Sequence, residues 1–401
     1  MTKNEKRLLM VNALYFLSST MSGVFVNVYL YAFTGSLVEM TIYSMVRFGF
    51  FPLGFLLGGY LGKRTRLSTS LTSGLVIIIA TLGFLLTFNS VITTHYYTIY
   101  LIGIAFGTGE GLYWFSTNNL SLAVSNKETR ALFVTTMSIT NAISTVLAPT
   151  IAALIVSFSP TDTQGYLFIF QLVILLHTIT AYLSSKIDVA ACKDNFTLID
   201  KFKIKNDPQW RYMMVSHLIF GVRDSATLVI MGLLLYNALG SVGSLYSTLL
   251  IVFSILGIVG STIVRKVQRR DNRLTLYTYG AYTLFGAAMV LVLSPNFTGA
   301  LIYGTLNALA APFFINPFSI IVMNAMQDYA EEGSVYGHMI IKEVMVDIGR
   351  LTGMAFILIA YAFLPETIYM AVAVFCSAIF APILVLYAGI YHRQRDKFTK
   401  V

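Results

Sequence analysis

The chain has 401 residues, of which 56% are hydrophobic and only 11% are charged. Because soluble domains carry about 25% charged residues, this composition excludes an ordinary soluble protein and indicates an integral membrane protein. The formal net charge is +9, but the cations lie at the ends of apolar segments, where anionic lipid headgroups attract them. We therefore expect the lipid bilayer as a partner and no nucleic acid.

Twelve apolar segments follow one another along the chain, and a membrane-spanning helix needs about 20 such residues. They cover residues 8–33, 37–62, 71–88, 96–124, 131–157, 165–185, 211–236, 242–264, 274–293, 299–325, 339–363 and 367–390. Turn residues such as Pro160 and Pro295 separate neighbouring segments. The sequence thus predicts an all-α integral membrane protein with twelve transmembrane helices.

The positions of Lys and Arg predict the orientation of these helices. Three arginines, Arg47, Arg223 and Arg350, fall near the middles of spans, and every other Lys and Arg falls in a terminus, in alternate loops or, like Arg211 and Lys342, at the end of a span next to such a loop. Cytoplasmic flanks of spanning helices collect Lys and Arg, whereas external loops do not. We therefore predict cytoplasmic termini and a multi-pass protein of the cell inner (cytoplasmic) membrane.

A polar connection over residues 186–210 divides the spans into two sets of six. The predicted domains are a half over residues 1–185, a cytoplasmic linker over 186–210 and a half over 211–401. The segment YSMVRFGFFPLGFLLGGYLGK (43–63) aligns with YSTLLIVFSILGIVGSTIVRK (246–266), and both are the second helix of their half. Because both helices run in the same direction, the two halves are predicted to be parallel repeats.

Three short segments accompany this architecture: GGYLGKRTR (58–66), GSTIVRKVQRR (260–270) and APTIAA (148–153). With them the chain resembles the major facilitator superfamily of secondary transporters. Three positions depart from the pattern of that family. Lys63 stands where an Asp is usual, Gly103 stands where an Arg is frequent, and Ala148 replaces a Gly.

The resemblance implies that predicted helices 1, 4, 7 and 10 line a central cavity. It also implies a secondary active transporter that moves a small organic solute by alternating access, with proton-coupled efflux, that is antiport, as the leading hypothesis. The alternatives are a lipid or glycolipid flippase and an uptake or exchange carrier for an organic anion. A membrane-embedded enzyme is less favoured, because the five His are scattered and no HExxH or GxxxxGK motif occurs. No cofactor or metal is expected, and the protein is expected to be a monomer.

Ionised residues inside spans are costly and usually face a partner or a water-filled cavity. The central charges are Arg47, Glu110, Arg223, Asp224, Asp347 and Arg350. They lie near the middles of their spans, so we expect them to share one layer of the membrane, where carriers hold substrate and coupling ion. They therefore form the candidate transport site.

Two interpretations of this layer stay open. Burial disfavours the charged form of a carboxylate, so Glu110, with Asp224 as second candidate, is predicted to bind and release the coupling proton. The predicted substrate-binding residues are Arg47, Arg223, Arg350, Asp347, Trp114, Tyr113, Asn141 and Asn316. Alternatively, the charges neutralise one another as structural pairs, with Asp347 and Arg350 three residues apart on one helical face.

Two further hypotheses concern gating. Pro312 and Pro317 are expected to interrupt the tenth helix and mark either a flexible gate or a packing kink. Glu343 is a candidate for a cytoplasmic latch with Lys127 or Arg130. The sequence does not specify the substrate, the direction of transport or the coupling ion.

Overall fold

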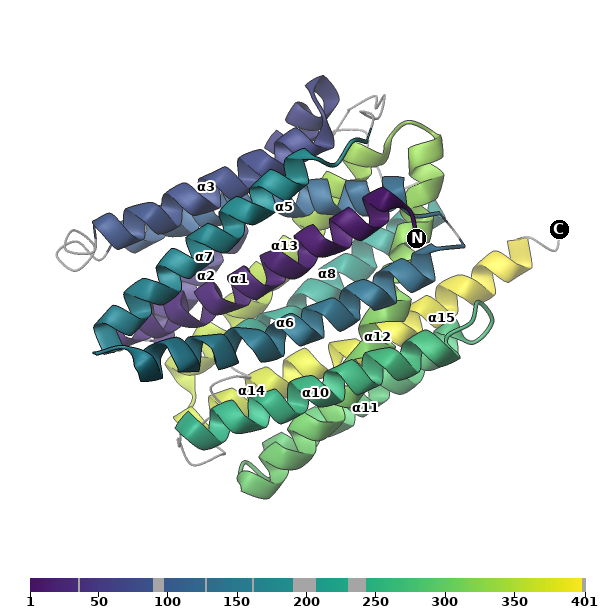
Figure 1. Cartoon of the computed structure of the whole chain (residues 1–401). Coiled ribbons are helices and arrows are strands. Elements are labelled where there is room, and N and C mark those ends of the chain that lie inside the picture. The colour runs from purple at the N-terminus through teal and green to yellow at the C-terminus, as the bar shows by residue number, and fades with distance from the viewer. Residues whose placement is uncertain are drawn as a thin grey trace. The chain divides into compact units, whose positions relative to one another are not determined.

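The computed structural model describes residues 1–34, 37–88, 97–126, 128–160, 162–189, 207–229 and 243–398. Over these ranges the chain forms helices and no strand (Figure 1). The chain divides into two compact units. The first contains Met1–Thr197 and Met326–Ile340, and the second contains Leu198–Ala325 and Ile341–Val401. Each unit is described by itself.

The first unit contains six helices from the N-terminal part of the chain, within the described residues. They are α1 (Lys3–Thr34), α2 (Leu37–Arg64), α3 (Leu67–Thr87), α5 (Thr98–Val124), α6 (Arg130–Phe158) and α7 (Asp162–Ser185). The remaining helices are α8 (Pro208–Val229), α10 (Gly243–Val267), α11 (Arg273–Leu293), α12 (Phe297–Glu331), α13 (Val335–Phe363), α14 (Glu366–Ala378) and α15 (Phe380–Phe398). These helices belong to the second unit, except for the end of α12 and the start of α13.

The predicted apolar segments coincide with these helices, and the segment 367–390 corresponds to α14 and α15 together. Eight spans within the described residues are long and apolar enough to cross a membrane. The prediction of an all-α membrane protein is therefore confirmed. The end of the predicted span 211–236 and much of the predicted linker lie outside the described residues.

The end of α12 and the start of α13 form a hairpin that packs within the first unit. Gly333 joins the two helices with φ of 68°. This left-handed conformation is the usual way to end a helix, and glycine adopts it without steric cost. Upstream, α12 is continuous through Pro312 and Pro317. The described helix is thus not broken at either proline, and the gate or kink expected there stays a prediction.

Helices α2 and α5 approach each other closely because glycines face their contact. A Cβ atom on Gly54 would lie within 3.0 Å of the Thr108 carbonyl oxygen, and one on Gly107 would meet the carbonyl oxygen of Arg47. A Cβ on Gly111 would likewise meet the Phe51 carbonyl oxygen. Small residues of this kind let helix backbones pack closely within membranes. The packing brings the middle of α2 against the middle of α5.

A second close crossing joins α8 and α13 in the second unit. A Cβ on Gly221 would meet the Val346 carbonyl oxygen, and a Cβ on Gly349 would meet that of Leu218. The backbones are therefore near contact at the level of these glycines. Asp224 on α8 and Arg350 on α13 follow the glycines closely in sequence, so the crossing brings these two side chains together.

Candidate functional site

The first cluster of charged side chains lies where α2 crosses α5. Arg47 donates from Nε to Glu110 Oε2 at 2.7 Å and from Nη2 to Glu110 Oε1 at 2.5 Å. The Glu110 side chain is 7% exposed and that of Arg47 is 23% exposed. Charge-assisted bonds from a planar guanidinium to both carboxylate oxygens are strong and geometrically specific. Glu110 is thus a paired buried carboxylate.

Aromatic side chains from α1 and α5 form a cluster in the same unit. The Tyr15 and Tyr113 rings stack with centroids 3.5 Å apart. Trp114 packs edge-on against Tyr15 at 6.0 Å and against Phe16 at 5.8 Å. Tyr15 and Tyr113 are buried, whereas Phe16 and Trp114 remain half-buried. Trp114 can therefore offer part of its ring to a ligand, whereas the Tyr113 ring is buried against Tyr15 and its role in binding stays a prediction.

Asn141 lies on α6 and joins this helix to α1. Its Oδ1 accepts a hydrogen bond of 2.9 Å from Asn12 Nδ2. Ser144, one turn further along α6, donates to the Ala13 carbonyl oxygen at 3.1 Å. Side-chain hydrogen bonds of this kind hold helices together inside membranes. In this structure Asn141 makes a helix-to-helix contact.

The second charged cluster surrounds Arg350 in the second unit. Arg350 Nε donates to Asp224 Oδ2 at 3.0 Å, and its Nη1 donates to Asp347 Oδ1 at 2.9 Å. The same Nη1 lies 3.6 Å from Glu343 Oε1. Lys342 Nζ donates to Glu343 Oε2 at 3.2 Å. We call these five residues the Arg350 cluster; they come from α8 and α13.

The sequence makes Glu343 a candidate for a latch with Lys127 or Arg130. Its ion-pair partners within the described residues are Lys342 and Arg350, and Lys127 lies outside those residues. Arg130 is fully buried at the start of α6 and donates from Nη2 to the Ser125 carbonyl oxygen and to Gln327 Oε1, both at 3.0 Å. Arg130 therefore binds the α12–α13 hairpin through Gln327.

Arg223 and Asn316 lie in the second unit. The Arg223 guanidinium carbon lies 5.1 Å from the centre of the Phe314 ring, a cation–π contact. No carboxylate of the described residues lies within ion-pair distance of Arg223. Asn316 is buried, and its Nδ2 has no hydrogen-bond partner in the described part of the chain.

The structure thus brings the six central charges into two clusters and a cation–π contact. Arg47 pairs with Glu110, while Asp224 and Asp347 both pair with Arg350. The sequence places Glu343, Asp347 and Arg350 on one stripe of a helix at i, i+4 and i+7, and the structure adds Lys342 to this group. Sequence reasoning missed Tyr15 and Phe16, for which a sequence offers no signal beyond their aromatic character.

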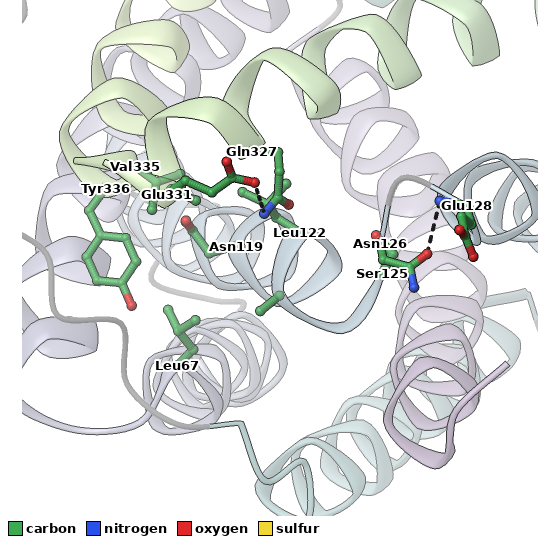
Figure 2. A pocket seen from close by; sticks show the side chains of 12 residues that line it. Leu67, Asn119, Leu122, Ser125, Asn126, Glu128, Gln327, Glu331, Val335 and Tyr336 are labelled. Atoms are coloured by element: carbon green, nitrogen blue, oxygen red, sulfur yellow. Dashed lines mark hydrogen bonds between the residues drawn. The ribbon is translucent and has the colours of Figure 1, made fainter. Parts of the chain in front are cut away.

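A pocket of about 730 Å³ opens at the end of α5 in the first unit. Its lining comes from α5, the segment after it, the α12–α13 hairpin and Leu67 (Figure 2). Gln327 Nε2 donates to Glu331 Oε1 at 3.4 Å along one wall. None of the predicted site residues lines this pocket. No group of three or more His, Cys, Asp or Glu in the described ranges is arranged to hold a metal ion.

A polytopic helical protein with ion pairs inside its apolar helices has the features of a membrane transporter. The sequence profile of the Major Facilitator Superfamily matches residues 8–341. The chain belongs to this superfamily. A curated relative, "Uncharacterized protein YqgE" of Bacillus subtilis, is 25% identical over 370 residues, which are 90% of this chain and 83% of that protein.

Solved structures of transporters share the fold. The Escherichia coli fucose:proton symporter FucP aligns with a TM-score of 0.72 and 11% identity, over 96% of this chain and 98% of that one. A bacterial homologue of the iron transporter ferroportin, in an outward-facing state with soaked iron, aligns with a TM-score of 0.71 and 14% identity, over 98% and 100%. The fold is thus that of these transporters, and membership of the superfamily makes the chain a multi-pass membrane transporter and not an enzyme.

Proposed function

We propose that this protein exports a small organic solute across the cytoplasmic membrane by alternating access and takes up protons in exchange. In this proposal the protein is a monomer with twelve transmembrane helices in two parallel six-helix repeats, and both termini lie in the cytoplasm. The alignment of residues 43–63 with 246–266 and the one-sided distribution of Lys and Arg support this arrangement. The family assignment supports the transport class.

The observation that carries the proposal is the pairing of buried acids with arginines in the middle of apolar helices. An isolated charge costs several kcal/mol or more at the centre of a bilayer, so such charges are kept where they have a function. Glu110 and Asp224 each accept hydrogen bonds from an arginine. Protonation of either acid would weaken its ion pair and release the arginine and its helix. A proton can therefore be coupled to helix movement.

Glu110 is the proposed proton-binding group of the first unit. In the second unit, the proposed proton-binding group is an acid of the Arg350 cluster, which contains the second candidate, Asp224. Arg47, Arg350 and Asp347 are proposed to rearrange when substrate binds. Trp114, Asn316 and Arg223 are proposed as direct substrate contacts. Trp114 is only half-buried, and the Asn316 Nδ2 has no hydrogen-bond partner among the described residues. The Arg223 guanidinium lies over the Phe314 ring and makes no ion pair with a described residue.

The charge of the substrate follows from the same contacts. Arg47 and Arg350 already bind carboxylates within their own units, so two of the three intramembrane guanidinium groups are occupied. An anionic substrate would have to displace a carboxylate that already forms a charge-assisted hydrogen bond with one of these arginines. We therefore propose a cationic or neutral organic solute rather than an organic anion.

The test is proton movement in liposomes that contain purified protein and a fluorescent pH reporter. Cationic drugs, sugar phosphates and organic anions would be added one class at a time, with protein-free liposomes as the control. We expect cationic or neutral compounds to trigger proton movement opposite to their own. Proton movement only with anions would contradict the proposed substrate class, and solute movement without protons would contradict the proposed coupling.

A further inference from the structure

The Arg350 cluster contains more acids than bases. Its carboxyl groups are Asp224, Glu343 and Asp347, and its cations are Lys342 and Arg350. If all five side chains were ionised, the cluster would carry a net charge of −1. An uncompensated charge inside a membrane protein is costly and is usually removed by protonation. One additional proton on the cluster would make it neutral.

Two other titratable groups on α8, Arg223 and His217, lie outside the ion pairs of the cluster. The Arg223 guanidinium lies over the Phe314 ring. His217 is buried on α8, and its Nδ1 lies 2.6 Å from the Met213 carbonyl oxygen. Neither Arg223 nor His217 makes an ion pair with an acid of the cluster within the described residues. The excess of one acid is therefore counted over the five residues that the ion pairs join, and Arg223 is not among them.

The three acids differ in their surroundings. The side chains of Asp224 and Glu343 are 18% and 9% exposed, whereas that of Asp347 is 2% exposed. Asp347 Oδ1 accepts from Arg350, but Oδ2 is buried and has no hydrogen-bond partner in the described part of the chain. A bare buried carboxylate oxygen is more costly than a neutral carboxyl group. Asp347 is consequently the acid on which a proton lowers the free energy most.

We propose that Asp347 is the proton-binding residue of the second unit, in place of Asp224, and that it carries the proton on Oδ2. When the proton leaves, the O–H bond breaks, its electron pair stays on Oδ2 and a water molecule accepts the proton. The cluster then has a net charge of −1, which a solute with one positive charge can neutralise. Its role in transport rests on the proposed proton coupling, whereas the protonation of Asp347 does not.

The experiment is infrared spectroscopy of purified protein in lipid at neutral pH. A protonated carboxyl group has a carbonyl stretch that is separate from the bands of a carboxylate. Growth on aspartate labelled with ¹³C at the side-chain carboxyl shifts this band only if an aspartic acid carries the proton. We expect one such band in the native protein, sensitive to the label. Absence of the band, or a band that the label does not shift, would overturn the inference.

Two matched substitutions assign the band to one residue. Asp347→Glu keeps the charge and should make the band insensitive to labelled aspartate, whereas Asp224→Glu should leave it sensitive. The reverse result would assign the proton to Asp224 and overturn the inference. Lys342→Met removes a cation and should add a second protonated carboxyl group. Glu110→Gln, in the other unit, should leave the band of Asp347 unchanged.

The measurement on the native protein needs no variant, so misfolding of one substitution does not leave the inference untested. The two proposals also fail differently. A label-sensitive band without proton transport would support protonation of Asp347 and contradict the proposed function. Proton transport without such a band would support the proposed function and contradict the assignment to Asp347.

Discussion

Arg47 binds both carboxylate oxygens of Glu110, with Nε 2.7 Å from Oε2 and Nη2 2.5 Å from Oε1. This fork-to-fork contact joins α2 to α5 at a place where glycines let the two backbones nearly touch. The pair as a whole is neutral, so it avoids the free-energy cost of an unpaired charge inside the membrane. Protonation of Glu110 would end this neutrality and leave Arg47 positively charged.

Removal of one partner of this pair should therefore be more harmful than removal of both. We expect Arg47→Gln or Glu110→Gln alone to lower stability by roughly 3–5 kcal/mol, because each leaves an uncompensated buried charge. The double variant Arg47→Gln/Glu110→Gln should recover most of this loss. Thermal unfolding of the four proteins in detergent measures the effect.

The same variants separate a structural role of the pair from a role in coupling. If Glu110 binds the coupling proton, the double variant should be stable but should transport solute without protons. Full proton-driven transport by the stable double variant would show that the pair is structural and would contradict the role proposed for Glu110.

The glycine contact between α2 and α5 gives a second prediction. Gly54→Ala would place a Cβ against the Thr108 carbonyl oxygen, so the helices must separate. Overpacking of this kind costs about 1–3 kcal/mol or more. Gly49→Ala lies on the same helix and its Cβ would meet nothing within 4 Å.

Thermal unfolding should show a clear decrease in Tm for Gly54→Ala and little change, or a slight increase, for Gly49→Ala. An increase is reasonable because alanine is the better helix former by about 0.5–1 kcal/mol. Equal unfolding temperatures for the two variants would contradict the close contact between α2 and α5.

Arg130 should be needed to hold the α12–α13 hairpin in the first unit. Its Nη2 donates to both Ser125 and Gln327, and hydrogen bonds from charged groups contribute about 1.5–3 kcal/mol each. Arg130→Met should therefore increase hydrogen exchange over residues 326–340. Arg130→Lys should have an intermediate effect, because lysine keeps the charge but lacks the guanidinium Nε, which also donates to Ser125 Oγ at 3.4 Å. Unchanged exchange in Arg130→Met would contradict this attachment.

The excess of acids in the Arg350 cluster predicts a preference for positively charged ligands. Tetraphenylphosphonium and tetraphenylborate have nearly the same shape and opposite charge. We expect tetraphenylphosphonium to inhibit transport of the native substrate competitively, and tetraphenylborate not to inhibit it. The Asp347→Asn variant, in which the cluster is neutral without a proton, should lose most of this difference. Stronger competition by the anion in the native protein would contradict the proposed charge preference.

The helices could be predicted from the sequence because each span is a continuous apolar segment, and such a segment has few stable alternatives in a membrane. The contact between Asp347 and Arg350 was also predictable, because residues three apart lie on one face of a helix. The pairing of Arg47 with Glu110 could not be predicted from the sequence. These residues are 63 positions apart, and their contact depends on which helices cross. The packing of residues 326–340 in the first unit is equally non-local.

The excess of acids around Arg350 could not be counted from the sequence for a related reason. Asp224 comes from α8 and the other members of the cluster come from α13. The sequence shows six central charges, three of each sign, and therefore suggests a balanced layer. Glu343 shares a helical stripe with Asp347 and Arg350 in the sequence, whereas only a contact in the folded protein connects Lys342 to this group.

The most direct test of proton-coupled export is accumulation of a solute against its own concentration gradient in liposomes. A compound identified by the proton-movement screen would be supplied at equal concentration on both sides, and a pH gradient would then be imposed. We predict that the solute accumulates on the more acidic side, that a proton ionophore abolishes the accumulation, and that Asp347→Asn still exchanges solute without accumulating it. Equal solute concentrations on both sides, despite a maintained pH gradient and active exchange, would contradict proton coupling.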